Sequence, residues 1–145
     1  MKFLRIYLVL LLTIIAVAAC SDDDEVNPTQ LPQNVVKTFN EMYANVVGVE
    51  WERVGGQFKA EFYREEGATE VWIESDGTWV RTETDFHQPL PEKVQNYVQQ
   101  NYSDYRIEDV DFVEIPSDAF FDLDLEKGDH YEFHLLIRAD GTPLN

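Results

Sequence analysis

Cysteine and basic residues are scarce in this sequence. Cys20 is the only cysteine among 145 residues, so no disulfide can form within the chain. Only 11 Lys and Arg accompany 28 Asp and Glu, which gives a formal net charge of −17. Because nucleic-acid binding requires a basic surface that neutralises phosphates, this balance excludes nucleic acid as a partner. It favours a cationic or neutral one.

Motifs of known catalytic sites are also missing. The chain contains no Gly-x-Ser-x-Gly, no phosphate-binding loop and no His-Glu-x-x-His. Carboxylates are abundant, but no pair stands out as having the two opposed environments that acid–base catalysis needs. We therefore expect that the protein is not an enzyme and that it uses no cofactor.

The first 19 residues have the pattern of a secretory signal peptide. Lys2 and Arg5 precede an uncharged apolar run over residues 6–19, which is too short to span a membrane. The run ends at Val17-Ala18-Ala19-Cys20, which resembles the lipobox of bacterial lipoproteins and predicts a lipid on Cys20. Removing residues 1–19 makes the net charge more negative by two.

Residues 20–30 are predicted to be an acidic tether. Its stretch Ser21-Asp22-Asp23-Asp24-Glu25 resembles the acidic signal that routes some Gram-negative lipoproteins to the cell surface, although a solvated spacer would have the same composition. We expect a protein anchored to the outer membrane by its lipid, on the periplasmic side or at the cell surface. The sequence does not decide between these two sides.

One short stretch of sequence occurs twice. LPQNVVKTFNEMY at residues 31–43 returns as LPEKVQNYVQQNY at residues 90–102, and both copies carry apolar residues at helical spacing. Each predicted helix is followed by alternating residues that end in Asp-Gly-Thr, at 76–78 and 140–142. This pattern predicts one domain over residues 31–145, built from the repeats 31–89 and 90–145.

The alternation also predicts how the strands pair. A two-residue turn at Asp76-Gly77 would set Ile73 opposite Val80 and Trp72 opposite Arg81. A turn at Glu66-Gly67 would likewise bring two apolar residues together, Phe62 and Val71. We therefore predict an α+β fold in which the two repeats share one antiparallel sheet with both helices on one face.

These motifs together resemble the PepSY-like, beta-lactamase-inhibitor-like family of secreted bacterial proteins. The resemblance rests on Leu-Pro-x-x-Val, the following tyrosine and the Asp-Gly-Thr hairpins, each present twice within residues 31–145. It implies a two-repeat architecture and a role in binding or inhibiting another protein, and it places no catalytic residue in this chain. The strong acidity and the longer sheet region of the second repeat depart from the family pattern.

The open face of the first repeat is the main candidate for binding a partner. The alternation puts a group of aromatic residues and an arginine on this face, namely Tyr63, Trp72, Trp79 and Arg81. Exposed aromatics beside arginine are typical of interaction hot spots. The same residues would also suit structural stacking between neighbouring strands. Our leading hypothesis is a lipid-anchored envelope protein whose open sheet face docks a protein or peptide, as an inhibitor or otherwise.

A second, weaker candidate is a metal site in the second repeat. A three-residue loop at residues 127–129 would place Asp122 opposite His134, with His130 and Glu132 on the same face. Two imidazoles and a carboxylate suit zinc, although a solvated polar face has the same composition. The alternative function is therefore an envelope protein that binds a cation or small ligand through this acidic and histidine-bearing face.

Overall fold

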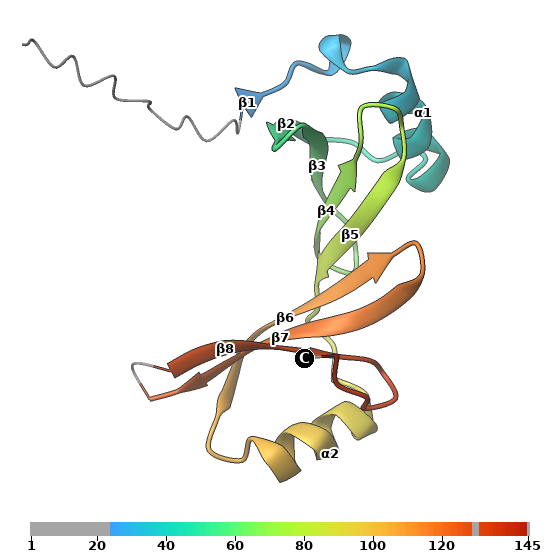
Figure 1. Ribbon diagram of the computed structural model, residues 1–145. Helices are drawn as coiled ribbons and strands as arrows, with labels where there is room; N and C mark the ends of the chain where they lie inside the picture. Colours follow the sequence, from blue (N-terminus) through green and yellow to red (C-terminus); the bar gives the residue numbers. More distant parts are fainter. Residues whose placement is uncertain (1–23, 129–130, 145) are drawn as a thin grey trace, which may run out of the picture.

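A computed structural model describes residues 24–128 and 131–144, and shows one antiparallel sheet of eight strands in chain order, with two α-helices (Figure 1). The elements are β1 Asp24–Glu25, η1 Pro28–Gln30, α1 Gln33–Met42, β2 Glu50–Val54, β3 Gln57–Tyr63, β4 Ala68–Ile73, β5 Trp79–Asp85, α2 Glu92–Asn101, β6 Arg106–Ile115, β7 Asp118–Lys127 and β8 Tyr131–Ile137. The predicted signal peptide and Cys20 lie outside the described residues. In the part of the chain that is described, neither helix has the length and apolar character needed to cross a membrane.

The sheet is continuous across the two repeats because β5 pairs with β6. In this pairing Thr82 lies opposite Glu114 and Thr84 opposite Phe112. Following the register from strand to strand shows that the α1-covered face of β3 and β4 continues as the α2-covered face of β7 and β8. The prediction of one sheet with both helices on one face is confirmed.

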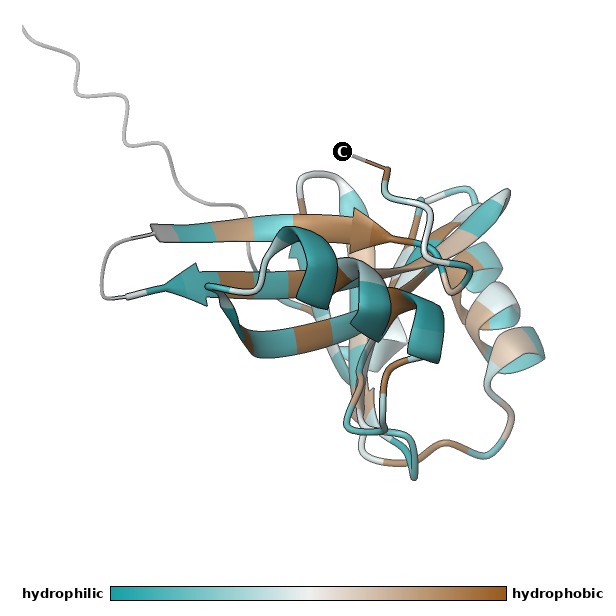
Figure 2. Ribbon diagram, turned by 90° about the horizontal axis from the view of Figure 1, so that it is seen from below, coloured by the Kyte–Doolittle hydropathy of each residue, from teal (hydrophilic) through white to brown (hydrophobic). Residues whose placement is uncertain are grey.

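Each helix covers its own hydrophobic core. Val35 and Phe39 of α1 pack on the first half of the sheet, and Val94 and Val98 of α2 pack on the second. Figure 2 shows apolar and polar residues alternating along the strands near α2, as expected for a sheet with one buried face. The two cores are separate clusters, so the junction between the repeats is held mainly by the β5–β6 pairing.

The repeated Asp-Gly-Thr turns attach the sheet to the helix N-termini. In the first turn the Asp76 carboxylate accepts a hydrogen bond from the Thr78 backbone N–H, at 2.9 Å. Gly77 has a φ of 91°, and a Cβ atom there would lie only 2.9 Å from the Asn34 carbonyl oxygen of α1. Gly141 likewise lies against Lys93 of α2, where a Cβ atom would be 3.1 Å from the carbonyl oxygen. The motif therefore has a structural role in both repeats.

The hairpin between β4 and β5 differs from the predicted register. Trp72 pairs with Arg81 as predicted, but Ile73 pairs with Trp79 rather than with Val80. The turn contains three residues, 75–77, closed by the hydrogen bond from the Glu74 N–H to the Thr78 carbonyl. A β-bulge between residues 72 and 73 then restores the register and leaves Val80 as the extra residue.

Two other turns are displaced from their predicted positions. Phe62 pairs with Thr69 rather than Val71, because the chain reverses at residues 65–66, between the mutually hydrogen-bonded Arg64 and Gly67. In the second repeat β7 and β8 remain paired as far as Lys127 and Tyr131. The predicted loop at 127–129 is therefore wrong, and each displacement changes cross-strand neighbours while preserving which face each side chain occupies.

The acidic segment before residue 31 is joined to the sheet. Asp24 pairs with Arg53 and Glu25 with Glu52, so β1 extends the edge of β2. The Val26 N–H continues this pairing by donating to the Trp51 carbonyl, at 2.7 Å. Only three residues, 21–23, therefore separate Cys20 from the first strand.

Candidate functional site: an acidic hollow on the open sheet face

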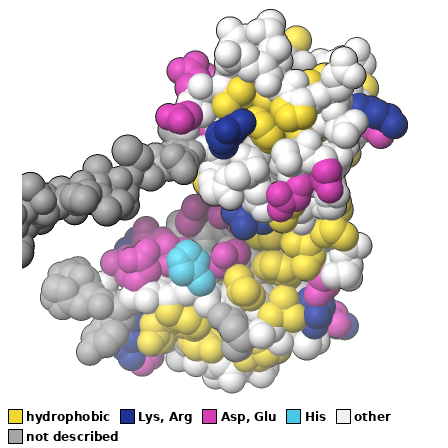
Figure 3. Space-filling view, turned by 45° about the horizontal axis from the view of Figure 1, so that its top comes forward, with side chains coloured by type: hydrophobic (Ala, Val, Ile, Leu, Met, Phe, Trp, Pro, Cys, Tyr) yellow, Lys and Arg dark blue, Asp and Glu magenta, His cyan; other side chains and the backbone are white. Residues whose placement is uncertain are grey.

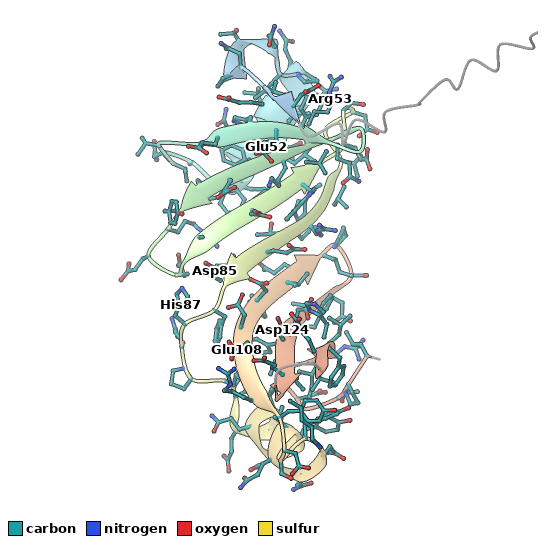
Figure 4. The ribbon with its side chains drawn as sticks, turned by 90° about the vertical axis from the view of Figure 1, so that its left-hand side faces the viewer. Glu52, Arg53, Asp85, His87, Glu108 and Asp124 are labelled. Carbon is teal, nitrogen blue, oxygen red and sulfur yellow. The ribbon has the colours of Figure 1, made fainter. Side chains whose placement is uncertain are left out.

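The sheet face opposite the helices is hollowed where the two repeats meet. A cavity of ≈ 340 Å³ opens there, lined by side chains from β3, β4, β5 and β6. The lining residues, which we call the acidic hollow, are Glu61, Tyr63, Ala68, Glu70, Glu83, Asp85 and Asp111. Figure 4 labels Asp85 at the place where β5 meets β6. Five of the seven lining residues are carboxylates, so the hollow is strongly acidic.

The strand register places these carboxylates directly opposite one another. Glu70 of β4 pairs with Glu61 on one side and Glu83 on the other. Asp111 of β6 similarly lies between Asp85 of β5 and Asp122 of β7. Like charges that face each other across strands are destabilising. The folded protein therefore carries an electrostatic cost on this face that a cation would relieve.

Lys59 offsets part of the charge at the β3 side of the hollow. Its ammonium lies 2.9 Å from Glu52, 3.5 Å from Glu70 and 3.9 Å from Glu61. Burial acts to lower the pKa of Lys59, but the hydrogen bond to Glu52 and the charges of the three glutamates outweigh it and raise the pKa. Lys59 is therefore already committed to its three neighbours.

Arg81 is the other nearby cation, and it is committed as well. Its guanidinium lies 3.9 Å from the centre of the Trp72 ring, and its Nε is 2.7 Å from a Glu83 carboxylate oxygen. Burial raises the pKa of Glu83 even though Arg81 acts in the opposite direction. Arg81 covers Trp72 and neutralises the edge of the hollow.

The carboxylates of Asp85 and Asp111 have no such partner in the described part of the chain. Among the ion pairs of the described residues, neither aspartate is within 4.0 Å of a lysine or arginine. Burial raises the pKa of Asp111 to about 6, with further contributions from Asp109, Asp85, Glu83 and Asp122. This pair is the least compensated part of the acidic hollow.

The predicted partner-binding residues occupy three different environments. Tyr63 is on the open face at the hollow, with 78% of its surface exposed. Trp72 is on the same face but is only 6% exposed beneath Arg81, as the stacking alternative predicted. The placement of Trp79 on the open face is wrong. Because its turn has three residues, Trp79 packs against the α1 core and its indole N–H donates to Thr82 Oγ1, at 3.1 Å.

The predicted metal-site residues are only partly assembled. His134 Nδ1 lies 3.0 Å from Asp122 Oδ1, but the residues that pair across the strands are Asp124 with His134 and Glu126 with Glu132. The prediction that Asp122 lies directly opposite His134 is wrong because the β7–β8 turn is displaced by one residue. Within residues 24–128 and 131–144, no group of three His, Cys, Asp or Glu is placed to hold a metal ion. His130 lies outside the described residues, so the zinc site stays a prediction.

Hydrogen bonds raise the pKa values of two residues of the predicted metal site. The contact with Asp122 raises the pKa of His134. A hydrogen bond shared with Asp124 raises the pKa of Glu132. Figure 3 shows acidic side chains gathered beside a histidine on one side of the waist between the two halves, with apolar side chains on the other side.

Sequence reasoning missed the central pair of the hollow. Asp85 ends β5 in the first repeat and Asp111 lies in β6 of the second, so neither is near the other in the sequence. The alternation did place Tyr63, which lines the hollow, on the open face. One signal was available: Asp85 is four residues from Arg81 on the same strand, so both lie on the open face. The sequence did not show, however, which strand pairs with β5 and therefore which residue lies opposite Asp85.

The fold and the hollow define this protein as a two-repeat α+β protein that leaves one face of its sheet uncovered. The family model described as "Putative beta-lactamase-inhibitor-like, PepSY-like" matches residues 20–62 and 56–142. The chain belongs to this family. A comparison with curated proteins gives no match.

Solved structures from Bacteroides share the fold. A DUF2874 family protein from Bacteroides ovatus ATCC 8483 is 28% identical, with a TM-score of 0.72 over 79% of this chain and 85% of the other. A BLIP-like protein from Bacteroides fragilis NCTC 9343 is 23% identical, with a TM-score of 0.72 over 79% and 84%. A structure from Bacteroides eggerthii DSM 20697, described among "putative periplasmic proteins", is 23% identical, with a TM-score of 0.71 over 79% and 86%.

Proposed function

We propose that this protein is a lipid-anchored binding protein of the bacterial envelope and that it docks another protein through its open sheet face. The observation that carries the proposal is the hollowed face itself, which no helix of the described residues covers because α1 and α2 both pack on the other side. Membership of an inhibitor-like family supports a protein partner, and inhibition is the finer form of the proposal.

The sequence of the N-terminus supports the proposed location. The predicted signal peptide and the lipobox ending at Cys20 support export followed by lipidation. A structural neighbour described as periplasmic supports an envelope location. With only three residues between Cys20 and β1, the sheet would be held close to the membrane surface, since an extended residue spans at most ~3.6 Å.

Site-specific cross-linking in cells tests the docking face. A photo-reactive amino acid at Tyr63 would report on the open face, and the same amino acid at Val47 would report on the loop between α1 and β2. Val47 is a matched control because it is 86% exposed but lies outside the sheet. We expect a discrete cross-linked protein from position 63 only. Equal products from both positions, or none from position 63, would contradict docking at this face.

The anchor is tested separately. Replacing Cys20 by serine should move the protein from the membrane fraction to the soluble fraction and abolish incorporation of a labelled fatty acid. Retention of the Cys20→Ser variant in the membrane would contradict anchoring through this residue. This outcome would leave the docking face open to its own test.

A further inference from the structure

We propose that the partner presents a lysine or arginine side chain and that its cationic group enters the acidic hollow between Asp85 and Asp111. The inference rests on the proposed function, that the open face docks a protein, and adds the chemistry of the docked segment. The proposed ligand is a protein segment and not a free amine or a metal ion.

Charge complementarity is the first argument. The hollow is lined by five carboxylates, and the two cations closest to it, Lys59 and Arg81, are already held by glutamates. The opposed carboxylates of Asp85 and Asp111 have no cation among the ion pairs of the described chain. An ammonium or guanidinium group between them would replace repulsion with two charge-assisted contacts.

The shape of the hollow is the second argument. Tyr63 pairs across the strands with Ala68, whose small side chain leaves room beside the exposed tyrosine ring. The resulting cavity of ≈ 340 Å³ has space for one long side chain. A lysine or arginine would lay its aliphatic stem against the Tyr63 ring and extend its charge toward the aspartates.

The surrounding surface favours a protein segment over a small amine. The hollow is one part of the sheet face opposite α1 and α2, and the sheet continues on both sides of it, toward β2 and toward β8. Tyr63 stands at the hollow with 78% exposure and without a covering side chain of the kind that Arg81 provides for Trp72. A free amine would fill the hollow and leave the Tyr63 ring exposed, whereas a basic protein segment would fill the hollow and also cover the ring.

Titration of defined probes tests this inference. The protein would be the chain from Ser21 onward, which keeps every described helix and strand. The probes are tetralysine, tetralysine acetylated on its side chains, and spermidine, followed by chemical shifts of the backbone amides. We expect tetralysine to shift the amides of Ala68, Asp85 and Asp111 most strongly, and both other probes to bind at least fivefold more weakly.

Variants with matched charge locate the effect. The Asp85→Asn/Asp111→Asn variant should weaken tetralysine binding at least tenfold. The Glu41→Gln/Glu92→Gln variant, with the same net charge but changes on the two helices, should weaken it less than twofold. Tyr63→Ala changes no charge and should weaken binding about threefold while leaving the amide spectrum of the core intact.

Each contrary result overturns the inference. These results are no binding of tetralysine, equal weakening by the two charge variants, equal binding of the acetylated peptide, or spermidine binding as tightly as tetralysine. The cross-linking experiment keeps this failure separate from failure of the docking proposal. Suppose that a partner is captured at position 63 and that Asp85→Asn/Asp111→Asn does not affect its capture. This result would support docking at the open face and would contradict the proposed basic side chain.

Discussion

Replacing Asp111 by asparagine should stabilise the protein at neutral pH. Burial and four neighbouring carboxylates raise the pKa of Asp111 from 3.8 to about 6. The folded state therefore holds this proton more tightly than the unfolded chain does, so ionising Asp111 costs folding free energy. This penalty grows as the pH rises from about 4 to about 6 and is constant at higher pH.

The size of the effect follows from the change in pKa. A rise from 3.8 to about 6 corresponds to ~3 kcal/mol if none of it is screened. Because the Asp111 side chain is partly exposed, solvent screening reduces this value, and we expect about 1.5 kcal/mol. For a domain of this length, such a gain would raise the melting temperature at pH 7.5 by roughly 5 °C.

Denaturant unfolding of the wild type and of Asp111→Asn at pH 4.0 and pH 7.5 measures this gain. The stabilisation should be present at pH 7.5 and largely absent at pH 4.0, where the wild-type carboxyl is protonated and resembles the amide. Glu41→Gln removes the same charge from an exposed site on α1 and should change stability by less than ~0.5 kcal/mol at either pH. A variant of Asp111 that is less stable at pH 7.5, or equally stabilised at both pH values, would refute the reasoning.

Three further predictions concern the fold, each measured by denaturant unfolding. Gly77→Ala should lower the free energy of unfolding by ~2–4 kcal/mol. Gly56 has the same φ of 91° but no atom within 4 Å of a new Cβ, so Gly56→Ala should lower it by only ~1 kcal/mol. Equal losses would contradict the close approach of Gly77 to α1. Trp79→Ala should lower the free energy of unfolding by ~2–3 kcal/mol, because Trp79 packs half-buried against the α1 core, and Tyr63→Ala should lower it by less than ~0.5 kcal/mol. A larger loss for Tyr63→Ala than for Trp79→Ala would contradict the packing of Trp79 against α1. Thr82→Val should cost ~1–3 kcal/mol, because two buried or half-buried hydrogen-bonding groups lose their partner; a neutral effect would contradict these bonds.

The helices and strand faces could be predicted from the sequence because they depend on local periodicity. Val35 and Phe39 are buried at helical spacing, and Phe58, Ala60 and Phe62 are buried at every second position. The side chain that meets the core is set by the geometry of a single helix or strand. The repetition of the pattern then predicted two similar helix-and-sheet units within one sheet, although each unit has its own core.

The registers could not be predicted in full because they depend on turn geometry. Asp76-Gly77 is typical of a two-residue turn, but the chain uses three residues there and compensates with a bulge. This arrangement lets Gly77 approach the α1 backbone, a contact between segments far apart in the sequence. Trp79 therefore packs, half-buried, against the α1 core rather than lying on the open face.

The sequence by itself determined the class of this protein. Its repeated helix motif and alternating strands specify two helix-and-sheet units, and its composition specifies an acidic surface without a disulfide. Only the tertiary structure decided where the acidity is concentrated. Asp85 and Asp111 belong to different repeats and become neighbours solely because β5 pairs with β6. Such a pairing depends on how the two repeats join, and the local periodicity of neither repeat encodes it.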